Sequence, residues 1–189
     1  MIIKALIVYG SRYGATARTS EEISKTLQWE KFDVRVINLK EENVNDITNY
    51  DLVIVGSGIK IGKWTKEPEL FIKKFQKELA KKKVALFVCC GSAQPLNDEE
   101  KNPEIMENYK RKYLKEKAIK YSLQPVALGF FGGVYDFNKV SWLFGKFMAG
   151  IKPKLEEAGF KETEPGVYDL RDLNIIRDWT KGVAKLVQF

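Results

Sequence analysis

The stretch from Ala5 to Ser20, Ala-Leu-Ile-Val-Tyr-Gly-Ser-Arg-Tyr-Gly-Ala-Thr-Ala-Arg-Thr-Ser, decides the fold of this chain. Its first five residues are apolar, which is typical of a strand that is buried on both faces of a parallel sheet. A small loop rich in glycine and hydroxyl groups follows, and then a helix with apolar positions at Ile23 and Leu27. The first turn of a helix has unpaired N–H groups and a partial positive charge, so this arrangement predicts an anion site.

A phosphate monoester is the anion that suits this loop. A nucleoside triphosphate loop needs G-x-x-x-x-G-K-[ST], and no such lysine follows Gly14. A dinucleotide loop needs G-x-G-x-x-G, and the spacing of Gly10 and Gly14 does not match it. The hydroxyls of Ser11 and Thr16 can add donors to the backbone N–H groups. The alternative is an ordinary strand-to-helix turn that contains Ser and Thr.

The rest of the chain alternates between apolar strands and amphipathic helices. Strands are expected at 34–39, 51–56, 84–90 and 125–131, and helices at 67–80, 104–121, 140–155 and 173–187. Helical spacing groups Leu70, Phe71, Phe75 and Leu79 on one face, and in the next helix Ile105, Tyr109 and Tyr113. This alternation predicts an α/β fold, a doubly wound open parallel sheet with helices on both faces.

Length and composition set further expectations. A chain of 189 residues with 44% hydrophobic residues is expected to form one domain, residues 1–189. It contains no histidine, which excludes imidazole base catalysis and histidine metal sites, and no metal site is expected. The adjacent Cys89 and Cys90 do not make a disulfide framework. No signal-like segment and no apolar run of about 18 residues is present, so a cytoplasmic location is expected.

Ligands of open parallel sheets bind beyond the carboxyl ends of the strands. Three small-residue loops are expected at that edge, namely 11–16, 57–64 and 89–93. The second and third consist of Ser57, Gly58, Ile59, Lys60, Ile61, Gly62, Lys63 and Trp64, and of Cys89, Cys90, Gly91, Ser92 and Ala93. Their backbone groups can bond the edge of a flat heteroaromatic ring, whose faces Ile59, Ile61 or Trp64 can cover. A phosphate site beside such a slot suits FMN.

The first loop resembles the signature of the flavodoxin-like FMN proteins, which is two aliphatics, an aromatic, any residue, Ser or Thr, two more, a small residue, any residue and Thr. The stretch 7–16 fits every position, and Ser20 stands where the signature has Ala. The resemblance implies a five-stranded sheet in the order 2-1-3-4-5. It also implies that Ser11, Arg12, Tyr13, Gly14, Ala15 and Thr16 hold the FMN phosphate, that 57–64 and 89–93 flank the isoalloxazine ring, and that Tyr135 faces the same ligand.

Two features resemble a subclass of that family, the flavodoxin-type protoporphyrinogen oxidases. The chain has a formal net charge of +7, and an aromatic-rich insertion is expected at about 132–168, after the fifth strand. The run from Ile59 to Trp64 is also similar. The resemblance implies a flavin-dependent oxidoreductase that passes electrons from a reduced organic donor, such as protoporphyrinogen IX, to a quinone. The flavin would perform the chemistry, with Arg12, Lys60 and Lys63 near the ring as stabilising cations.

Several alternatives stay open at this point. The protein is also compatible with a one-electron flavodoxin-type carrier, an NAD(P)H-dependent quinone reductase or a basic protein without flavin. The apolar positions of 140–151 suit core packing, a lid over the flavin or a face resting on a membrane, which would make the protein peripheral on its inner surface. No aromatic–basic nucleic-acid motif is present, so no nucleic-acid partner is expected. Related FMN oxidoreductases commonly dimerise, which implies a homodimer as one option.

Overall fold

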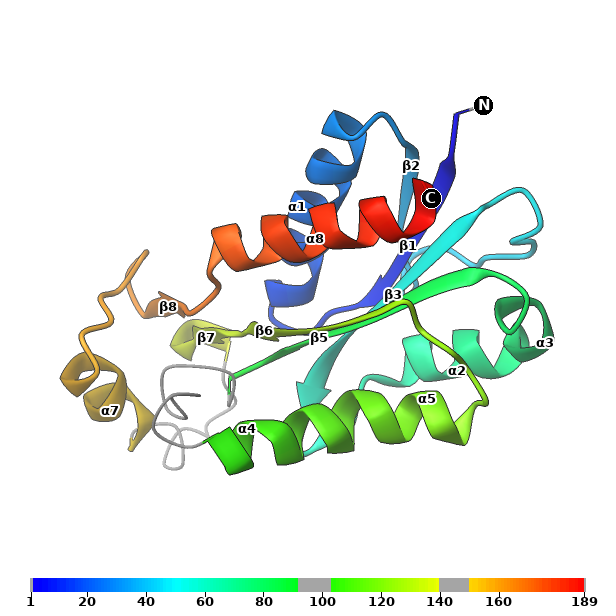
Figure 1. The fold of residues 1–189 in the computed structure, drawn as a ribbon. Coiled ribbons are helices and arrows are strands. Elements are labelled where there is room, and N and C mark those ends of the chain that lie inside the picture. The colour runs from blue at the N-terminus through cyan, green and yellow to red at the C-terminus, as the bar shows by residue number, and fades with distance from the viewer. Residues whose placement is uncertain (1, 92–102, 140–149, 189) are drawn as a thin grey trace.

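A five-stranded parallel sheet forms the centre of the computed structural model, which describes residues 2–91, 103–139 and 150–188 (Figure 1). Its strands follow the order β2-β1-β3-β5-β6. They are β1 (Lys4–Gly10), β2 (Asp33–Asn38), β3 (Leu52–Lys60), β5 (Lys83–Cys90) and β6 (Ala127–Gly132). The α/β class and the predicted order 2-1-3-4-5 are therefore confirmed. The two-residue strand β4 (Lys63–Trp64) pairs antiparallel with β3 and lies off this path.

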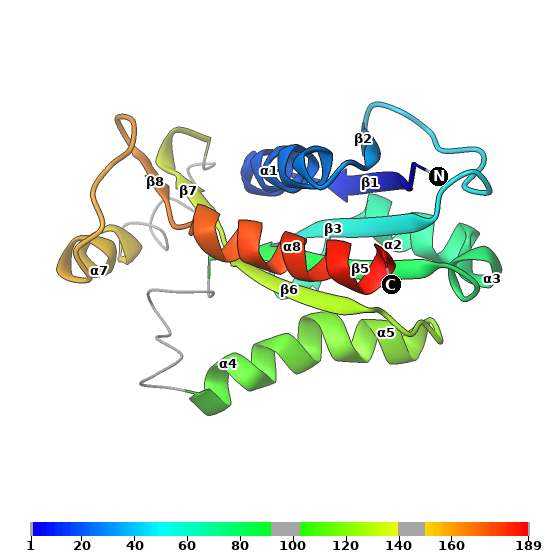
Figure 2. The ribbon, with the colours of Figure 1, turned by 45° about the horizontal axis from the view of Figure 1, so that its top comes forward.

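Helices cover both faces of the sheet (Figures 1 and 2). One face carries α1 (Ala15–Trp29) and α8 (Leu173–Gln188), and Ile23 and Leu27 of α1 are fully buried against it, as predicted. The other face carries α2 (Lys66–Lys74), α3 (Gln76–Leu79), α4 (Pro103–Lys110), the π-helical segment η1 (Arg111–Lys115) and α5 (Glu116–Lys120). The apolar strands β1, β3 and β5 are thus buried on both sides, which explains their continuous apolar sequences.

The single helix predicted over 67–80 is wrong, because the helix is interrupted at Phe75. Phe71, Phe75 and Leu79 are buried as expected, but Leu70 is 51% exposed and does not belong to the buried face. The buried face therefore continues across the interruption at every fourth residue, and Leu70 lies beside this face rather than on it.

The helix predicted over 104–121 is present, with a π-helical turn at Arg111–Lys115 in its middle. Tyr113 is buried, and its ring stacks on that of Tyr109 at 5.8 Å between centroids. Phe130 from β6 stacks on both rings. The prediction is wrong for Ile105, which is 41% exposed. A π turn widens the helix locally and shifts the positions that face the sheet.

A second, antiparallel sheet follows β6 and was not predicted. It pairs β7 (Val134–Asp136) with β8 (Val167–Asp169), and η2 (Phe137–Lys139) and α7 (Ile151–Glu157) lie between them in the chain. α7 contains the end of the helix predicted over 140–155, and residues 140–149 of that prediction lie outside the described residues. Arg18 of α1 reaches Asp169 at 4.0 Å, so this sheet contacts the main domain beside α1. Within the described ranges, no helix has the length and apolar character needed to cross a membrane.

Candidate functional site

The loop between β1 and α1 has the geometry of an anion site. Gly14 is the N-cap of α1 with φ +92°, a conformation that glycine adopts without strain. Its N–H donates to the Ser11 hydroxyl at 3.1 Å, and it has no side chain to accept the N–H groups of the first turn. Those N–H groups therefore stay available to a ligand, and they favour a negatively charged one.

Cations surround this loop. The ammonium group of Lys40, the second residue after β2, donates to the Ser11 carbonyl oxygen. The exposed Arg12 guanidinium lies 5.4 Å from the centroid of the Tyr13 ring. Ala15 and Thr16 are buried beneath the loop. Lys40 was not predicted as a site residue. The signal in the sequence was a lysine shortly after β2, the strand that pairs with β1.

The end of β3 packs directly against this loop. A Cβ atom on Gly58 would lie 3.3 Å from the Thr16 hydroxyl, and one on Gly10 would lie 2.4 Å from the Thr65 hydroxyl. The buried Ser57 hydroxyl accepts the Thr65 N–H at 3.0 Å and lies 3.1 Å from the Thr65 hydroxyl. Two of the three predicted loops therefore form one compact unit. Thr65 was not predicted, and its only sequence signal was a hydroxyl that follows the glycine-rich stretch.

The predicted loop 57–64 is a β-hairpin instead. β3 continues to Lys60, and β4 returns antiparallel to it, with Ile59 opposite Trp64. Ile61 and Gly62 form the turn with φ values of +47° and +70°, the combination that type I′ hairpin turns require. Ile61 is 75% exposed, whereas Ile59 is partly buried against the core. Of the three side chains expected to cover a ring, Ile61 is the most accessible.

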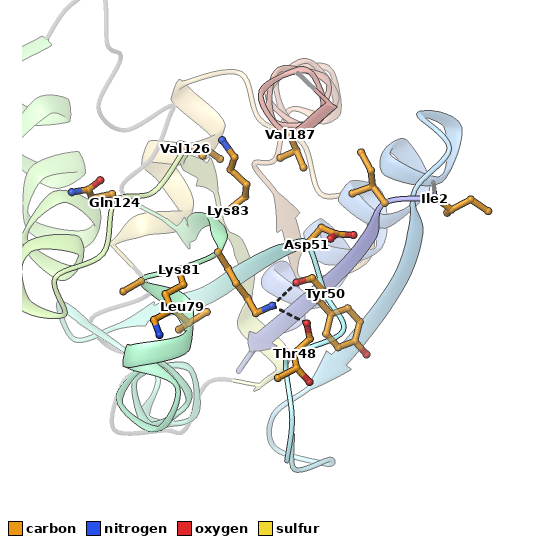
Figure 3. A pocket seen from close by; sticks show the side chains of 13 residues that line it. Ile2, Thr48, Tyr50, Asp51, Leu79, Lys81, Lys83, Gln124, Val126 and Val187 are labelled. Atoms are coloured by element: carbon orange, nitrogen blue, oxygen red, sulfur yellow. Dashed lines mark hydrogen bonds between the residues drawn. The ribbon is translucent and has the colours of Figure 1, made fainter.

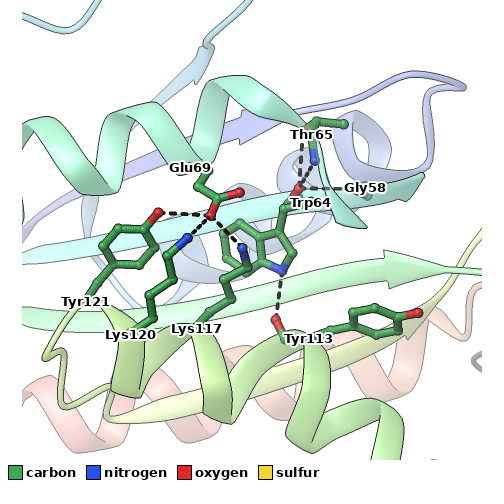
Figure 4. Close-up of polar contacts among 9 residues, drawn as sticks. Gly58, Trp64, Thr65, Glu69, Tyr113, Lys117, Lys120 and Tyr121 are labelled. Atoms are coloured by element: carbon green, nitrogen blue, oxygen red, sulfur yellow. Dashed lines mark hydrogen bonds and ion pairs between the residues drawn. The ribbon is translucent and has the colours of Figure 1, made fainter. Parts of the chain in front are cut away.

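Trp64 lies in the core and holds the base of the hairpin (Figure 4). Its side chain is 5% exposed, and the indole N–H donates to the Tyr113 carbonyl oxygen in η1 at 2.7 Å. The Lys117 ammonium lies 5.8 Å from the centroid of the indole ring. The structure thus gives Trp64 a supporting position, with the hairpin bonded to the helix that packs beside it.

A polar cluster joins α2 to α5 next to this contact (Figure 4). The Glu69 carboxylate accepts hydrogen bonds from Lys117 at 2.6 Å, from Lys120 at 2.8 Å and from the Tyr121 hydroxyl at 2.9 Å. Burial alone raises the pKa of Glu69, but these three bonds outweigh it and lower the pKa to about 2. Glu69 is therefore ionised at neutral pH, and the cluster stabilises the helices behind the hairpin.

Cys89 and Cys90 lie in β5 and are buried, which confirms the strand predicted over 84–90; the loop predicted over 89–93 therefore does not include them. As consecutive strand residues they pack on opposite faces of the sheet. Burial raises the pKa of Cys89 to about 12, although a contact with the Thr19 hydroxyl at 3.3 Å opposes the shift. A neutral buried thiol is a poor nucleophile, which argues against redox chemistry at Cys89.

Tyr135 lies in β7 and approaches the end of β5, and its predicted contact with the ligand stays a prediction. A Cβ atom on Gly91 would lie 2.4 Å from the Tyr135 hydroxyl oxygen. Burial, followed by the proximity of Cys90, raises the pKa of Tyr135 to about 12, so the phenol stays protonated. The predicted site residues Ser92 and Ala93 lie outside the described residues.

A surface cavity of about 770 Å³ lies at the opposite end of the sheet (Figure 3). Ile3, Asp51 and Val126, which line it, directly precede β1, β3 and β6. The Lys82 ammonium closes one wall by donating to the carbonyl oxygens of Thr48 at 3.0 Å and Tyr50 at 2.7 Å. This cavity is therefore separate from the site at the carboxyl ends. Within 2–91, 103–139 and 150–188, no group of three or more acidic or cysteine side chains could hold a metal ion.

The fold and the first loop define a doubly wound α/β protein with an anion site at the carboxyl end of β1. A family model described as a flavodoxin domain matches residues 6–159, and the chain belongs to the flavodoxin family. Flavodoxins bind FMN, so the cofactor expected from the sequence is confirmed at the level of this family. The narrower resemblance to protoporphyrinogen oxidases has no such support.

Individual relatives agree with this family. A flavodoxin of Clostridium beijerinckii is 34% identical over 87 residues, which are 45% of this chain and 63% of that protein. A short-chain flavodoxin associated with a non-canonical PDU bacterial microcompartment is 12% identical with a TM-score of 0.59, and 98% and 99% of the two chains are covered. The two-electron reduced flavodoxin of Megasphaera elsdenii is 17% identical with a TM-score of 0.55, and the coverage is 96% and 98%. These two structures support the fold alone.

Proposed function

We propose that the protein binds FMN non-covalently and acts as a flavodoxin-type electron carrier. The observation that carries the proposal is the loop before α1, where Gly14 leaves the first-turn N–H groups available and the Ser11 hydroxyl bonds the Gly14 N–H. Thr16 lies in the first turn of α1, with its hydroxyl beside Gly58. These groups fit a phosphate monoester, since they supply donors without a fixed counter-charge. FMN supplies the electron-transfer chemistry when it is bound.

The chain's own residues would bind and orient this cofactor. We assign the phosphate to residues 11–16, where Lys40 and Arg12 add positive charge. The hairpin 57–64 continues from β3, and Gly91 contacts Tyr135 beyond the ends of β5 and β6 at the same edge of the sheet. We assign the ring to the space between the hairpin and this contact. Exposed cations at Lys60 and Lys63 would stabilise negative charge on a reduced ring.

Titration of the apo protein with FMN tests this proposal. Flavin fluorescence is expected to be quenched at one equivalent. Thr16→Val is expected to weaken binding by at least about tenfold, because one charge-assisted hydrogen bond contributes roughly 1.5–3 kcal/mol. Thr26→Val is the matched control on the same helix, where the hydroxyl donates to the Glu22 carbonyl away from the loop. Equal FMN affinity in the Thr16 and Thr26 variants would refute the assignment.

A second candidate function is a two-electron oxidoreductase with a reduced organic donor and a quinone acceptor. The basic net charge and the lysines at the hairpin favour it over a carrier that serves basic partners. Steady-state turnover separates the two functions. Rapid oxidation of protoporphyrinogen IX with menadione as acceptor would support the oxidoreductase, whereas reduction of the flavin without turnover would support the carrier. Rapid bleaching by NADPH would instead support a quinone reductase.

A further inference from the structure

The tip of the β3–β4 hairpin, residues 60–63, combines two locally unfavourable features at an exposed point. Ile61 has a φ of +47°, a conformation that β-branched residues very rarely adopt, and its side chain is 75% exposed. Lys60 and Lys63 are directly opposite each other across the antiparallel pair. Like charges in that position destabilise a hairpin. Folding does not explain these choices, and such exceptions are typical of functional positions.

A third cation from another element lies beside the hairpin tip. The Lys112 ammonium of η1 is 3.6 Å from the position of a Cβ atom on Gly62. Two acidic side chains on the neighbouring helices are engaged with other lysines, since Glu107 pairs with Lys115 and Glu69 pairs with Lys117. In the part of the chain that the structure describes, Lys60, Lys63 and Lys112 have no ion-pair partner. Three ammonium groups without an ion-pair partner therefore lie at or beside the two-residue turn that carries the exposed Ile61.

We propose that the hairpin tip is the docking surface for an acidic protein partner, with Ile61 as the central apolar contact and the three lysines as its charged rim. The inference rests on the proposed electron-carrier function, because it places the partner beside the assigned flavin site. A partner with surface carboxylates would relieve the repulsion between Lys60 and Lys63. It would also be attracted over a distance by the field of the three ammonium groups.

The shape of the hairpin tip favours a protein over other anionic ligands. Small molecules bind in concave sites, whereas the isoleucine at this turn is three-quarters exposed. A membrane-binding surface is typically an amphipathic helix with several large apolar side chains, and the hairpin tip offers one aliphatic side chain. An apolar centre with a polar, charged rim is the usual anatomy of a protein interface.

Binding to a defined acidic protein tests the proposal without any contribution from flavin chemistry. The probe is a plant-type [2Fe–2S] ferredoxin, measured by isothermal titration calorimetry with apo and FMN-loaded protein, and basic mitochondrial cytochrome c is the counter-probe. Affinity for ferredoxin is expected to fall with rising salt and to fall at least about tenfold in K60E/K63E. The control K77E/K81E makes the same change of net charge on exposed lysines away from the hairpin and is expected to change affinity less than about twofold.

The variant Ile61→Gly separates docking from folding. Glycine adopts the positive φ of this position without strain, so the urea midpoint of unfolding is expected to rise while ferredoxin affinity falls. The inference is overturned if K60E/K63E binds ferredoxin as the parent does, if Ile61→Gly keeps full affinity, or if the parent binds phosphatidylglycerol vesicles or cytochrome c in preference to ferredoxin. Failure to bind FMN would refute the proposed function, and the ferredoxin titration of the apo protein would still decide the docking surface.

Discussion

Replacement of Trp64 by Phe tests whether the hydrogen bond to η1 holds the hairpin in place. The indole N–H of this 5% exposed side chain donates to the Tyr113 carbonyl at 2.7 Å. Phenylalanine keeps an aromatic ring but leaves the buried carbonyl without this donor, which costs about 1–3 kcal/mol. The smaller ring adds roughly 1 kcal/mol for the space that it leaves. We therefore expect the free energy of unfolding to fall by about 2–4 kcal/mol.

Urea unfolding followed by circular dichroism measures this loss. With a denaturant dependence in the upper part of the usual range of about 1–3 kcal/mol/M, the midpoint should fall by roughly 1 M. The matched control is Trp29→Phe, because Trp29 is 82% exposed at the end of α1, and its midpoint should hardly change. β-(3-Benzothienyl)alanine at position 64 keeps the ring size and removes only the donor. The reasoning fails if this isostere unfolds at the parent's midpoint.

Three further predictions follow from other contacts. Gly10→Ala should destabilise the protein by about 1–3 kcal/mol in urea unfolding, because its Cβ would lie 2.4 Å from the Thr65 hydroxyl. The control Gly182→Ala places its Cβ in open space on α8 and should stabilise the protein by about 0.5–1 kcal/mol. Glu69→Gln should lower the free energy of unfolding by about 1–3 kcal/mol at pH 7. The difference in stability between parent and variant should disappear as pH falls from about 4.5 toward 2, because the pKa of Glu69 in the folded state lies below its ordinary value. Identical dependence of stability on pH in the two proteins would contradict this. Cys89 should react with a thiol reagent at pH 8 only after unfolding, since its pKa is about 12.

The sheet and its order were predictable because each central strand is a short, continuous apolar run. The third apolar run predicts a strand that ends at Gly56, because Gly-Ser-Gly is a typical loop sequence, but β3 continues to Lys60. In the structure, Ser57 pairs with Gly10 on one side and Val88 on the other, so that tertiary pairing overrides the local preference. The β7–β8 pair was missed for a related reason, because it joins two three-residue segments far apart in sequence.

In the candidate site, too, the local sequence predicted some residues, whereas others take their positions only from tertiary packing. The phosphate loop was readable because glycine and hydroxyl residues have direct local roles at a helix start. Lys40 was not predicted because it bonds the Ser11 carbonyl from a different part of the chain. Thr65 was not predicted because its bond to Ser57 forms only when 57–64 folds into the β3–β4 hairpin. Their roles depend on the approach of neighbouring strand ends, which residue type alone does not encode.

The β3–β4 hairpin has a base that buried contacts stabilise and a tip whose local conformation is unfavourable. An isoleucine with positive φ costs about 1–2 kcal/mol, and the opposed Lys60 and Lys63 add to that cost. The Trp64 bond to η1 and the Ser57 bond to the Thr65 N–H each contribute about 1 kcal/mol or more at the base. These terms are of similar size and opposite sign, so the base can hold the unfavourable tip in one conformation. The position of the tip is thus set by buried contacts, while its exposed side chains remain free to match a partner.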